Sequence, residues 1–123
     1  MWLIETGSKT KEQIADDSTS WGNYNNATFE YVNSSGSTVT KNENSGTKIP
    51  TGNTEYTKAN NIYDLAGNVY DWTMEASSTY DRVCRGGNYS SSGGNYPAGY
   101  RNSYGSPTYS NYYFGCRSAL YIK

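Results

Sequence analysis

Short groups of hydrophobic residues, separated by polar stretches, predict the first elements of the chain. The apolar positions of residues 2–6 predict the end of a helix, which Gly7 closes as its C-cap. Residues 8–17 predict a second short helix, because Thr10 and Gln13 have the spacing of a capping box. The chain is therefore expected to begin with two brief helical segments.

Alternation of hydrophobic and polar residues predicts a hairpin in the next region. Residues 29–32 alternate like a half-buried strand, and residues 33–37 supply a turn before residues 38–40. Residues 47–57 contain proline and glycine and predict an ordered loop.

The densest hydrophobic region follows this loop. Residues 61–73 surround a Gly-Asn turn and predict a tight turn that leads into a buried strand. Residues 81–87 predict another strand, ended by a glycine pair, and residues 114–121 alternate like a strand of the core.

The composition indicates an ordered domain whose core is aromatic. Leu, Ile, Val and Phe together number 14, about 11% of the 123 residues. A share below roughly 20%, combined with a high net charge, is typical of disordered chains. Here the net charge is −1, and 14 Tyr and 3 Trp supply apolar surface. We therefore expect residues 1–123 to form a single loop-rich domain, or part of one.

Several classes of function are disfavoured by residues that the sequence lacks. His is absent, which removes the commonest metal ligand and the commonest general base. No apolar run approaches the roughly 20 residues of a membrane helix, so we expect no membrane insertion. Residues 88–123 carry three cations and no acid, too few for a groove that follows phosphates. We therefore expect no nucleic acid among the partners.

Residues 88–121 differ in composition from the rest of the chain. Their 34 positions include 8 Tyr, 7 Ser, 5 Gly and 4 Asn, and no Lys, Glu, Gln, Trp, Met, Asp or His. The first five of these absent types occur 17 times in residues 1–87. A low-complexity linker is one explanation, but the placement of Pro97, Arg101 and Pro107 argues against it.

The order of several motifs resembles the C-terminal half of the formylglycine-generating, or sulfatase-modifying, domain. These motifs are Trp-Gly-Asn at 21–23, IYDLAGNVYDWT at 62–73, RVCRGG at 82–87, Tyr100-Arg101, and GCRSA at 115–119. The resemblance covers about residues 20–121. It implies an irregular α+β fold of the C-type-lectin-like class, loop-rich with small antiparallel sheets. The N-terminal strands of that fold are missing here, so the remaining part of the domain is itself an expected partner.

Within that superfamily, residues 88–121 resemble the variable region of diversity-generating retroelement proteins, which occur in phages and bacteria. Such regions are rewritten at adenines of template codons, mostly those for Asn. The rewritten codons reach Tyr, Ser, Gly, Asn and Cys, but not Lys, Glu, Gln, Trp or Met. Asp and His are reachable but also absent from the segment. The resemblance implies that residues 88–121 form a variable, ligand-binding region.

Enzymes of the sulfatase-modifying family oxidise a substrate Cys with copper held by two Cys just beyond the Arg-Gly-Gly motif. Residues 88–100 contain no Cys here, and Tyr or Ser does not replace the thiolate ligands of Cu(I). For Cys84 and Cys116 we expect first a buried hydrophobic role and second a cross-strand disulfide. We therefore expect neither copper nor catalysis, with an oxidase of this family as the alternative.

Two carboxylates flank the Gly-Asn turn. Asp64 and Asp71, with the carbonyls of Gly67 and Val69, resemble a calcium loop of the same family. Ca²⁺ takes about 6–8 oxygen ligands, so waters or other groups would complete the site. Asp71 is one methylene shorter than the Glu usual in the family. The alternative is that both carboxylates only cap the turn by accepting backbone N–H bonds.

The tyrosine-rich segment predicts a binding surface. In antibody paratopes Tyr gives contact area at a low entropy cost, while Ser and Asn supply adaptable hydrogen bonds. The candidate ligand-binding residues are Asn88, Tyr89, Asn95, Tyr96, Asn102, Ser103, Tyr104, Tyr109, Asn111, Tyr112 and Tyr113. The competing interpretation places several tyrosines in the core, with Tyr89, Tyr100 and Tyr121 as the first candidates.

Together these features predict a ligand-binding variable protein that performs no catalysis. Its partner is expected to be a protein or a glycan on a target cell or phage, and its location the virion or the bacterial cell surface. The hypothesis requires outward-facing Tyr and Asn between residues 88 and 113 to gather on one surface. A purely structural fragment is the remaining alternative.

Overall fold

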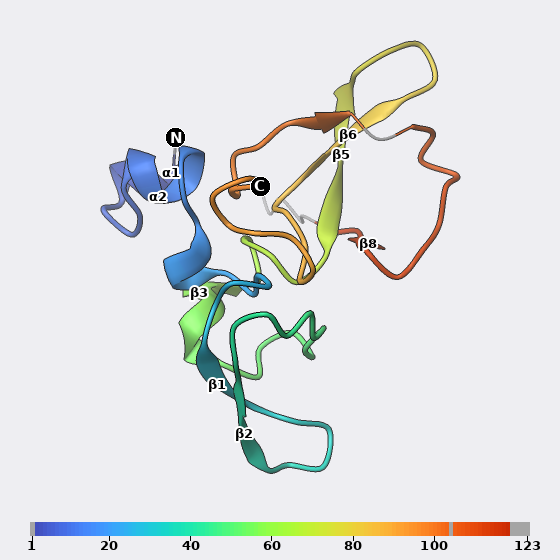
Figure 1. Ribbon diagram of the computed structural model, residues 1–123. Coiled ribbons are helices and arrows are strands. Elements are labelled where there is room, and N and C mark those ends of the chain that lie inside the picture. Colours follow the sequence, from blue (N-terminus) through green and yellow to red (C-terminus); the bar gives the residue numbers. More distant parts are fainter. Residues whose placement is uncertain (1, 104, 119–123) are drawn as a thin grey trace.

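The computed structural model describes residues 2–103 and 105–118, which form short helices and small sheets (Figure 1). The expectation of an irregular α+β fold is confirmed at this level. The helical segments are α1 (Trp2–Glu5), α2 (Lys11–Ala15), η1 (Thr19–Trp21) and η2 (Glu55–Thr57). The strands are β1 (Phe29–Val32), β2 (Thr38–Lys41), β3 (Lys58–Ala59), β4 (Ile62–Tyr63), β5 (Tyr70–Ala76), β6 (Arg82–Arg85), β7 (Asn102–Ser103) and β8 (Phe114–Gly115). None of the helices in this part of the chain has the length and apolar character needed to cross a membrane.

Both predicted N-terminal helices form. After α1, Gly7 has a φ of +68°, and its N–H donates to the Ile4 carbonyl oxygen at 2.9 Å. At the start of α2, the Thr10 hydroxyl accepts from the Gln13 N–H at 3.2 Å, and the Gln13 side chain accepts from the Thr10 N–H at 2.9 Å. The capping box is therefore complete, and Ile14 anchors α2 in the core.

The strands form three small sheets, of which two are hairpins. β1 and β2 pair antiparallel, as the sequence predicted, and β3 pairs with β4. The third sheet has the order β7-β6-β5-β8, with β8 parallel to β5. The expectation of small antiparallel sheets holds for the other pairs, and this parallel pair departs from it. It arises because the chain leaves β7 at one edge of the sheet and crosses over to the opposite edge, where β8 pairs with β5.

The strand expected at residues 114–121 is much shorter in the structure. β8 contains only Phe114 and Gly115, and residues 116–118 are exposed and outside any strand. Beyond β8, the Arg117 Nε donates to the Asp71 Oδ2 at 2.9 Å, at the surface. Residues 119–121 lie outside the described residues.

The core is built around aromatic side chains, as the composition predicted. Trp21, Tyr24 and Phe29 are buried in one cluster. The Trp21 Nε1 donates to the Gln13 carbonyl oxygen at 2.9 Å, and the Tyr24 hydroxyl donates to the Gly86 carbonyl oxygen at 2.7 Å. Because the Trp21 N–H and the Tyr24 hydroxyl are both hydrogen-bonded, burying these side chains leaves no unpaired polar group in the core.

The two cysteines have different environments and are not bonded to each other. Cys84 is fully buried in β6, as expected for a small hydrophobic residue. Cys116 is exposed, so the same expectation is wrong for that residue. A disulfide between them is not formed.

A thiol reagent applied to the native protein is expected to modify Cys116 and to spare Cys84. Burial raises the pKa of the Cys84 thiol to about 12, so almost no reactive thiolate is present at neutral pH. Peptide mass spectrometry after a short exposure to iodoacetamide measures both sites, and the Cys116→Ser variant should show no native labelling. Equal labelling of the two cysteines in the folded protein would contradict the burial of Cys84.

Candidate functional site

Aromatic side chains of β5 and β8 form the floor of the candidate site. Because side chains alternate along a strand, Tyr70 and Trp72 lie on the same face of the four-stranded sheet. Phe114 stacks on both, with ring centroids 5.6 Å from Tyr70 and 5.0 Å from Trp72. Tyr109 packs edge-on against Phe114 at 5.9 Å. These contacts join two strands and the segment that precedes β8 into one aromatic cluster.

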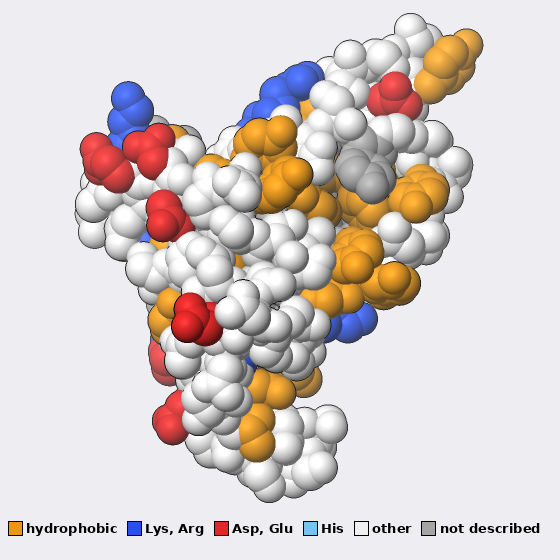
Figure 2. Space-filling view, viewed as in Figure 1, with side chains coloured by type: hydrophobic (Ala, Val, Ile, Leu, Met, Phe, Trp, Pro, Cys, Tyr) orange, Lys and Arg blue, Asp and Glu red, His pale blue; other side chains and the backbone are white. Residues whose placement is uncertain are grey.

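Further tyrosines extend this cluster towards solvent. The Tyr113 ring lies 5.4 Å from the Tyr89 ring and 4.5 Å from the Tyr112 ring, and Tyr112 is 64% exposed. The Tyr70 N–H donates to the Tyr113 carbonyl oxygen at 2.7 Å, which fixes this group against β5. We call the following residues the aromatic face: Tyr70, Trp72, Tyr89, Tyr109, Tyr112, Tyr113 and Phe114. Figure 2 shows hydrophobic side chains gathered over this part of the molecule.

A cavity of about 360 Å³ adjoins the aromatic face, and we call it the tyrosine cavity. Its aromatic lining consists of Tyr70, Tyr96, Tyr100, Tyr113 and Phe114. Its polar lining consists of Asn88, Ser90, Ser91 and Asn102. The rings of Tyr96 and Tyr100 meet edge to face, with centroids 5.2 Å apart. None of these lining side chains carries a formal charge.

Most of the predicted ligand-binding residues lie at the aromatic face or the tyrosine cavity. Those with a ring or amide at one of the two are Tyr89, Tyr96, Asn102, Tyr109, Tyr112 and Tyr113. Asn111 supports them, because its Oδ1 accepts from the Tyr113 N–H at 2.8 Å and its Nδ2 donates to the Tyr109 hydroxyl at 3.3 Å.

The remaining predicted residues do not join this surface as exposed contacts. Asn88 is only 6% exposed, and its Oδ1 accepts from the Ser90 N–H at 2.9 Å and from the Ser91 hydroxyl at 3.0 Å. Its amide holds a turn and it reaches the site only as part of the lining of the tyrosine cavity, so its role in ligand binding stays a prediction. Asn95 and Ser103 are exposed but do not line the tyrosine cavity. Tyr104 lies outside the described residues.

The division of tyrosines between core and surface also differs from the competing interpretation. Tyr100 is 43% exposed and is not a core residue, Tyr89 is half-buried, and Tyr121 lies outside the described residues. The sequence analysis did not predict the floor of the site, formed by Tyr70, Trp72 and Phe114, because its candidate binding residues all lie within residues 88–113. The signal was the pair Tyr70 and Trp72, which share one face of a strand.

Comparison with known proteins gives no family: no family model, curated protein or solved structure matches the chain. The interpretation of the site therefore depends on its own geometry.

Two of the candidate calcium residues are joined by an arginine. Asp71 accepts from Arg117 through its Oδ2, and the Arg117 Nη2 donates to the Asp64 carbonyl oxygen at 2.8 Å. A guanidinium group therefore bridges two of the predicted positions. Among the described residues, no three His, Cys, Asp or Glu side chains come close enough to hold a metal ion. The expected site needs only two carboxylates, so it is not tested by that finding.

The Asp64 side chain is an unusual buried group. It is 4% exposed, and both its carboxylate oxygens lack a hydrogen-bond partner. Burial raises the pKa of the carboxyl group; the hydroxyls of Thr57 and Thr51 oppose part of this shift, although neither makes a hydrogen bond of good geometry to it. The alternative interpretation, in which this carboxylate caps the turn by accepting backbone N–H bonds, is therefore wrong for Asp64.

The turn itself is held by amides. The Asn68 Oδ1 accepts from the Ile49 N–H and from the Asn23 Nδ2, both at 3.1 Å, and its Nδ2 donates to the Ile49 carbonyl oxygen at 3.0 Å. Asn68 therefore replaces the carboxylates as the residue that fixes this turn.

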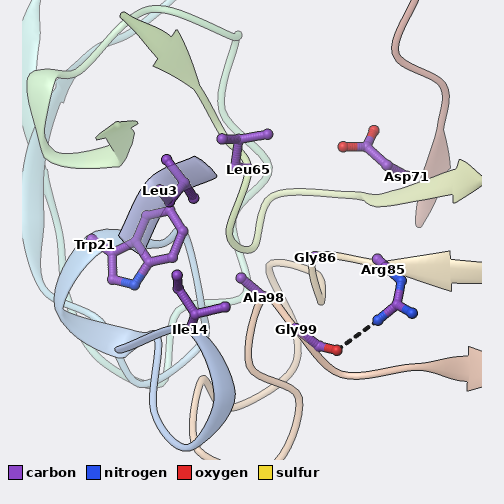
Figure 3. Close-up of a pocket in the computed structure, with 9 residues that line it drawn as sticks. All are labelled: Leu3, Ile14, Trp21, Leu65, Asp71, Arg85, Gly86, Ala98 and Gly99. Carbon is purple, nitrogen blue, oxygen red and sulfur yellow. Dashed lines mark hydrogen bonds between the residues drawn. The ribbon is translucent and has the colours of Figure 1, made fainter. Parts of the chain in front are cut away.

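A second cavity, of about 410 Å³, lies on the opposite side of β5 and β6 and is mainly apolar (Figure 3). Asp71 faces it because it alternates with Tyr70 and Trp72 along β5. Its apolar lining includes Leu3, Ile14, Trp21, Leu65 and Ala98. Figure 3 shows Asp71 and Arg85 at its other end, with the Arg85 Nη1 donating to the Gly99 carbonyl oxygen at 2.7 Å.

Proposed function

We propose that this chain is a ligand-binding protein without catalytic activity, and that it binds through the aromatic face and the tyrosine cavity. The observation that carries the proposal is the gathering of Tyr89, Tyr109, Tyr112 and Tyr113 on a floor supplied by a sheet. Tyrosine-rich surfaces on rigid scaffolds concentrate binding energy in a few residues. The sheet limits the entropy lost on binding, because the rings are already packed against one another.

The sequence resemblance supplies the biological setting of this proposal. In it, the scaffold has a C-type-lectin-like fold, and residues 88–121 are the variable region of a diversity-generating retroelement protein. The partner is a protein or a glycan on a target cell or phage, and the protein is displayed on a virion or a bacterial surface. The segment between β6 and β8 fits a variable region, because its exposed tips can change without altering β5 or β6.

A bound Ca²⁺ ion is a secondary part of the proposal. The two carboxylates among its four predicted ligands differ in how well they suit the ion. Asp64 fits, because both oxygens of its buried carboxylate lack a hydrogen-bond partner, and the nearby Arg117 guanidinium donates to its backbone carbonyl and not to these oxygens. Asp71 does not fit in the same way, because its Oδ2 is already paired with Arg117. Asp64 would hold the ion with the carbonyls of Gly67 and Val69, and Ca²⁺ would stabilise the turn by offsetting the buried charge.

The apolar cavity could receive a segment of one further partner. Its apolar side chains line an open volume of about 410 Å³ beside α1 and α2, which a hydrophobic polypeptide segment would fill. We propose that a hydrophobic segment of another polypeptide packs there, on the side of the sheet opposite the aromatic face.

Replacement of Tyr112 by Ala is expected to weaken binding to target cells by at least about tenfold. Fluorescently labelled protein is incubated with a panel of bacterial species, and bound protein is measured by flow cytometry. Tyr112 is exposed and packs against the neighbouring Tyr113 ring at the face, so its loss should leave folding intact. The dissociation constant of the complex should rise by at least about tenfold. Tyr80→Ala is the matched control, because Tyr80 is 80% exposed in the connection between β5 and β6, outside the aromatic face.

The proposal fails if binding to a responsive species is the same for Tyr112→Ala as for Tyr80→Ala and the unmodified protein. Near-ultraviolet circular dichroism on the same samples confirms that each variant keeps its tertiary packing.

A further inference from the structure

The chemistry of the tyrosine cavity limits the ligands that it can hold. Its lining combines aromatic rings with amide and hydroxyl groups and includes no Asp, Glu, Lys or Arg. A phosphate or carboxylate group that entered it would lose hydration without meeting an opposite charge, and an ammonium group would gain only the attraction of the ring faces in exchange for its hydration. The cavity therefore favours uncharged ligands.

The charged cluster of Glu75, Arg85 and Arg101 does not line the cavity, and its two cations are engaged by one carboxylate and by backbone carbonyl groups. Glu75 pairs with the Arg85 Nη2 at 2.8 Å and with the Arg101 Nε at 2.5 Å. The Arg85 Nη1 is also engaged, with the Gly99 carbonyl oxygen. These cations are therefore committed to Glu75 and the backbone and are not available to an anionic ligand in the cavity.

The arrangement of the lining suits a ligand with one apolar face and a polar rim. Tyr96 and Tyr100 meet at 79°, so their rings form two walls of a corner. The Asn102 amide and the Ser90 hydroxyl supply hydrogen-bonding groups elsewhere on the lining. The C–H face of a sugar ring packs on aromatic rings, and its hydroxyls exchange hydrogen bonds with amides and hydroxyls.

The volume of the cavity limits the size of the ligand that can enter it. A volume of about 360 Å³ is near the lower end of the range of roughly 300–1,000 Å³ for small-molecule pockets. It accommodates one or two sugar units and is too small for a folded peptide element. We infer that the tyrosine cavity binds a neutral sugar unit of a glycan, directly through these side chains and without Ca²⁺. This inference rests on the proposed binding function and specifies its ligand.

The test uses the whole chain and simple sugars as probes. Methyl glycosides of glucose, galactose, mannose and N-acetylglucosamine are titrated in the presence of EDTA, with glucuronic acid and glucosamine as charged counterparts. Binding is followed by saturation-transfer NMR and by chemical-shift changes of tyrosine ring signals. At least one neutral glycoside is expected to bind at millimolar concentration, and both charged sugars are expected to bind at least about tenfold more weakly.

Variants separate the cavity from the rest of the aromatic face. Tyr100→Ala and Asn102→Ala are each expected to weaken the glycoside by about tenfold, and Tyr100→Phe, which keeps the ring, by less. Tyr80→Ala is expected to have no effect. The inference is overturned if no neutral glycoside binds, if a charged sugar binds as well, or if Tyr100→Ala leaves the affinity unchanged.

The two proposals can fail separately. If cell binding depends on Tyr112 but no glycoside binds, the proposed binding function stands, the sugar inference is wrong, and a protein target takes its place. If a glycoside binds in the cavity but Tyr112→Ala leaves cell binding unchanged, the aromatic face is not the functional surface.

Discussion

Replacement of Gly67 by Ala is expected to destabilise the protein strongly. Gly67 has a φ of +71°, and a Cβ atom there would lie 2.3 Å from the Asn23 carbonyl oxygen and 2.5 Å from its carbon. The two backbones meet in a parallel bridge, where the Asn68 N–H donates to the Asn23 carbonyl oxygen at 2.8 Å. Backbone atoms cannot rotate away, so the added methyl must separate the two segments.

The expected loss is roughly 2–5 kcal/mol in the free energy of unfolding, from left-handed backbone strain and from overpacking. The loss would extend to the core, because Asn23 precedes the buried Tyr24 in sequence. Urea unfolding followed by tryptophan fluorescence measures it. Gly36→Ala is the matched control, since Gly36 has a φ of +79° but nothing within 4 Å of the added Cβ. If both variants lose the same stability, the close contact between Gly67 and Asn23 is not real.

The parts of the fold that sequence predicts well are those with short-range causes. The capping box of Thr10 and Gln13 and the hairpin of residues 29–41 each depend on residues a few positions apart. The pairing of β8 with β5 depends on residues more than 40 positions apart, and no local pattern encodes its parallel direction. The length of β8 was likewise overestimated from local alternation, and Arg117 beyond it pairs with the distant Asp71.

The candidate site was predicted in its variable part but not in its support. Composition identified the tyrosines of residues 88–113, because a bias of residue types is visible without a fold. It did not separate Asn88, whose amide holds a turn, from Tyr112, whose ring is exposed. The floor of Tyr70, Trp72 and Phe114 needed the sheet, since only the register of β5 and β8 brings these rings together.

Replacement of Asp64 by Asn is expected to stabilise the protein at pH 7 when Ca²⁺ is absent. The ionised carboxylate is buried and both its oxygens lack partners, so it carries a desolvation penalty that the neutral amide reduces. Asp64 has a φ of +58°, a conformation that Asn also tolerates, so the backbone is not strained by the change. The expected gain in the free energy of unfolding is about 1–3 kcal/mol.

The gain should depend on pH in a direction set by the Asp64 pKa. Burial raises this pKa above its ordinary value of 3.8, so the folded state binds the proton more tightly than the unfolded chain does. As pH rises from 3.8 through the raised pKa, the unmodified protein therefore loses the stability that comes from tighter proton binding to Asp64 in the folded state. Below pH 3.8 the unmodified protein and the Asp64→Asn variant should differ little in stability. Thermal unfolding in EDTA between acidic and neutral pH measures the difference, and Asp16→Asn, at an exposed position, is the control.

Addition of Ca²⁺ to the same samples distinguishes a buried charge that is merely tolerated from one that holds a cation. If Asp64 is a calcium ligand, Ca²⁺ should raise the unfolding temperature of the unmodified protein at pH 7 and leave that of Asp64→Asn nearly unchanged, because a ligand that binds only the folded state stabilises it. The neutral variant would then lose its advantage at saturating Ca²⁺. If Ca²⁺ shifts neither protein while Asp64→Asn remains the more stable, the carboxylate is an uncompensated charge and the calcium proposal is wrong. A variant less stable than the unmodified protein in EDTA would instead contradict the unpaired burial of Asp64 itself.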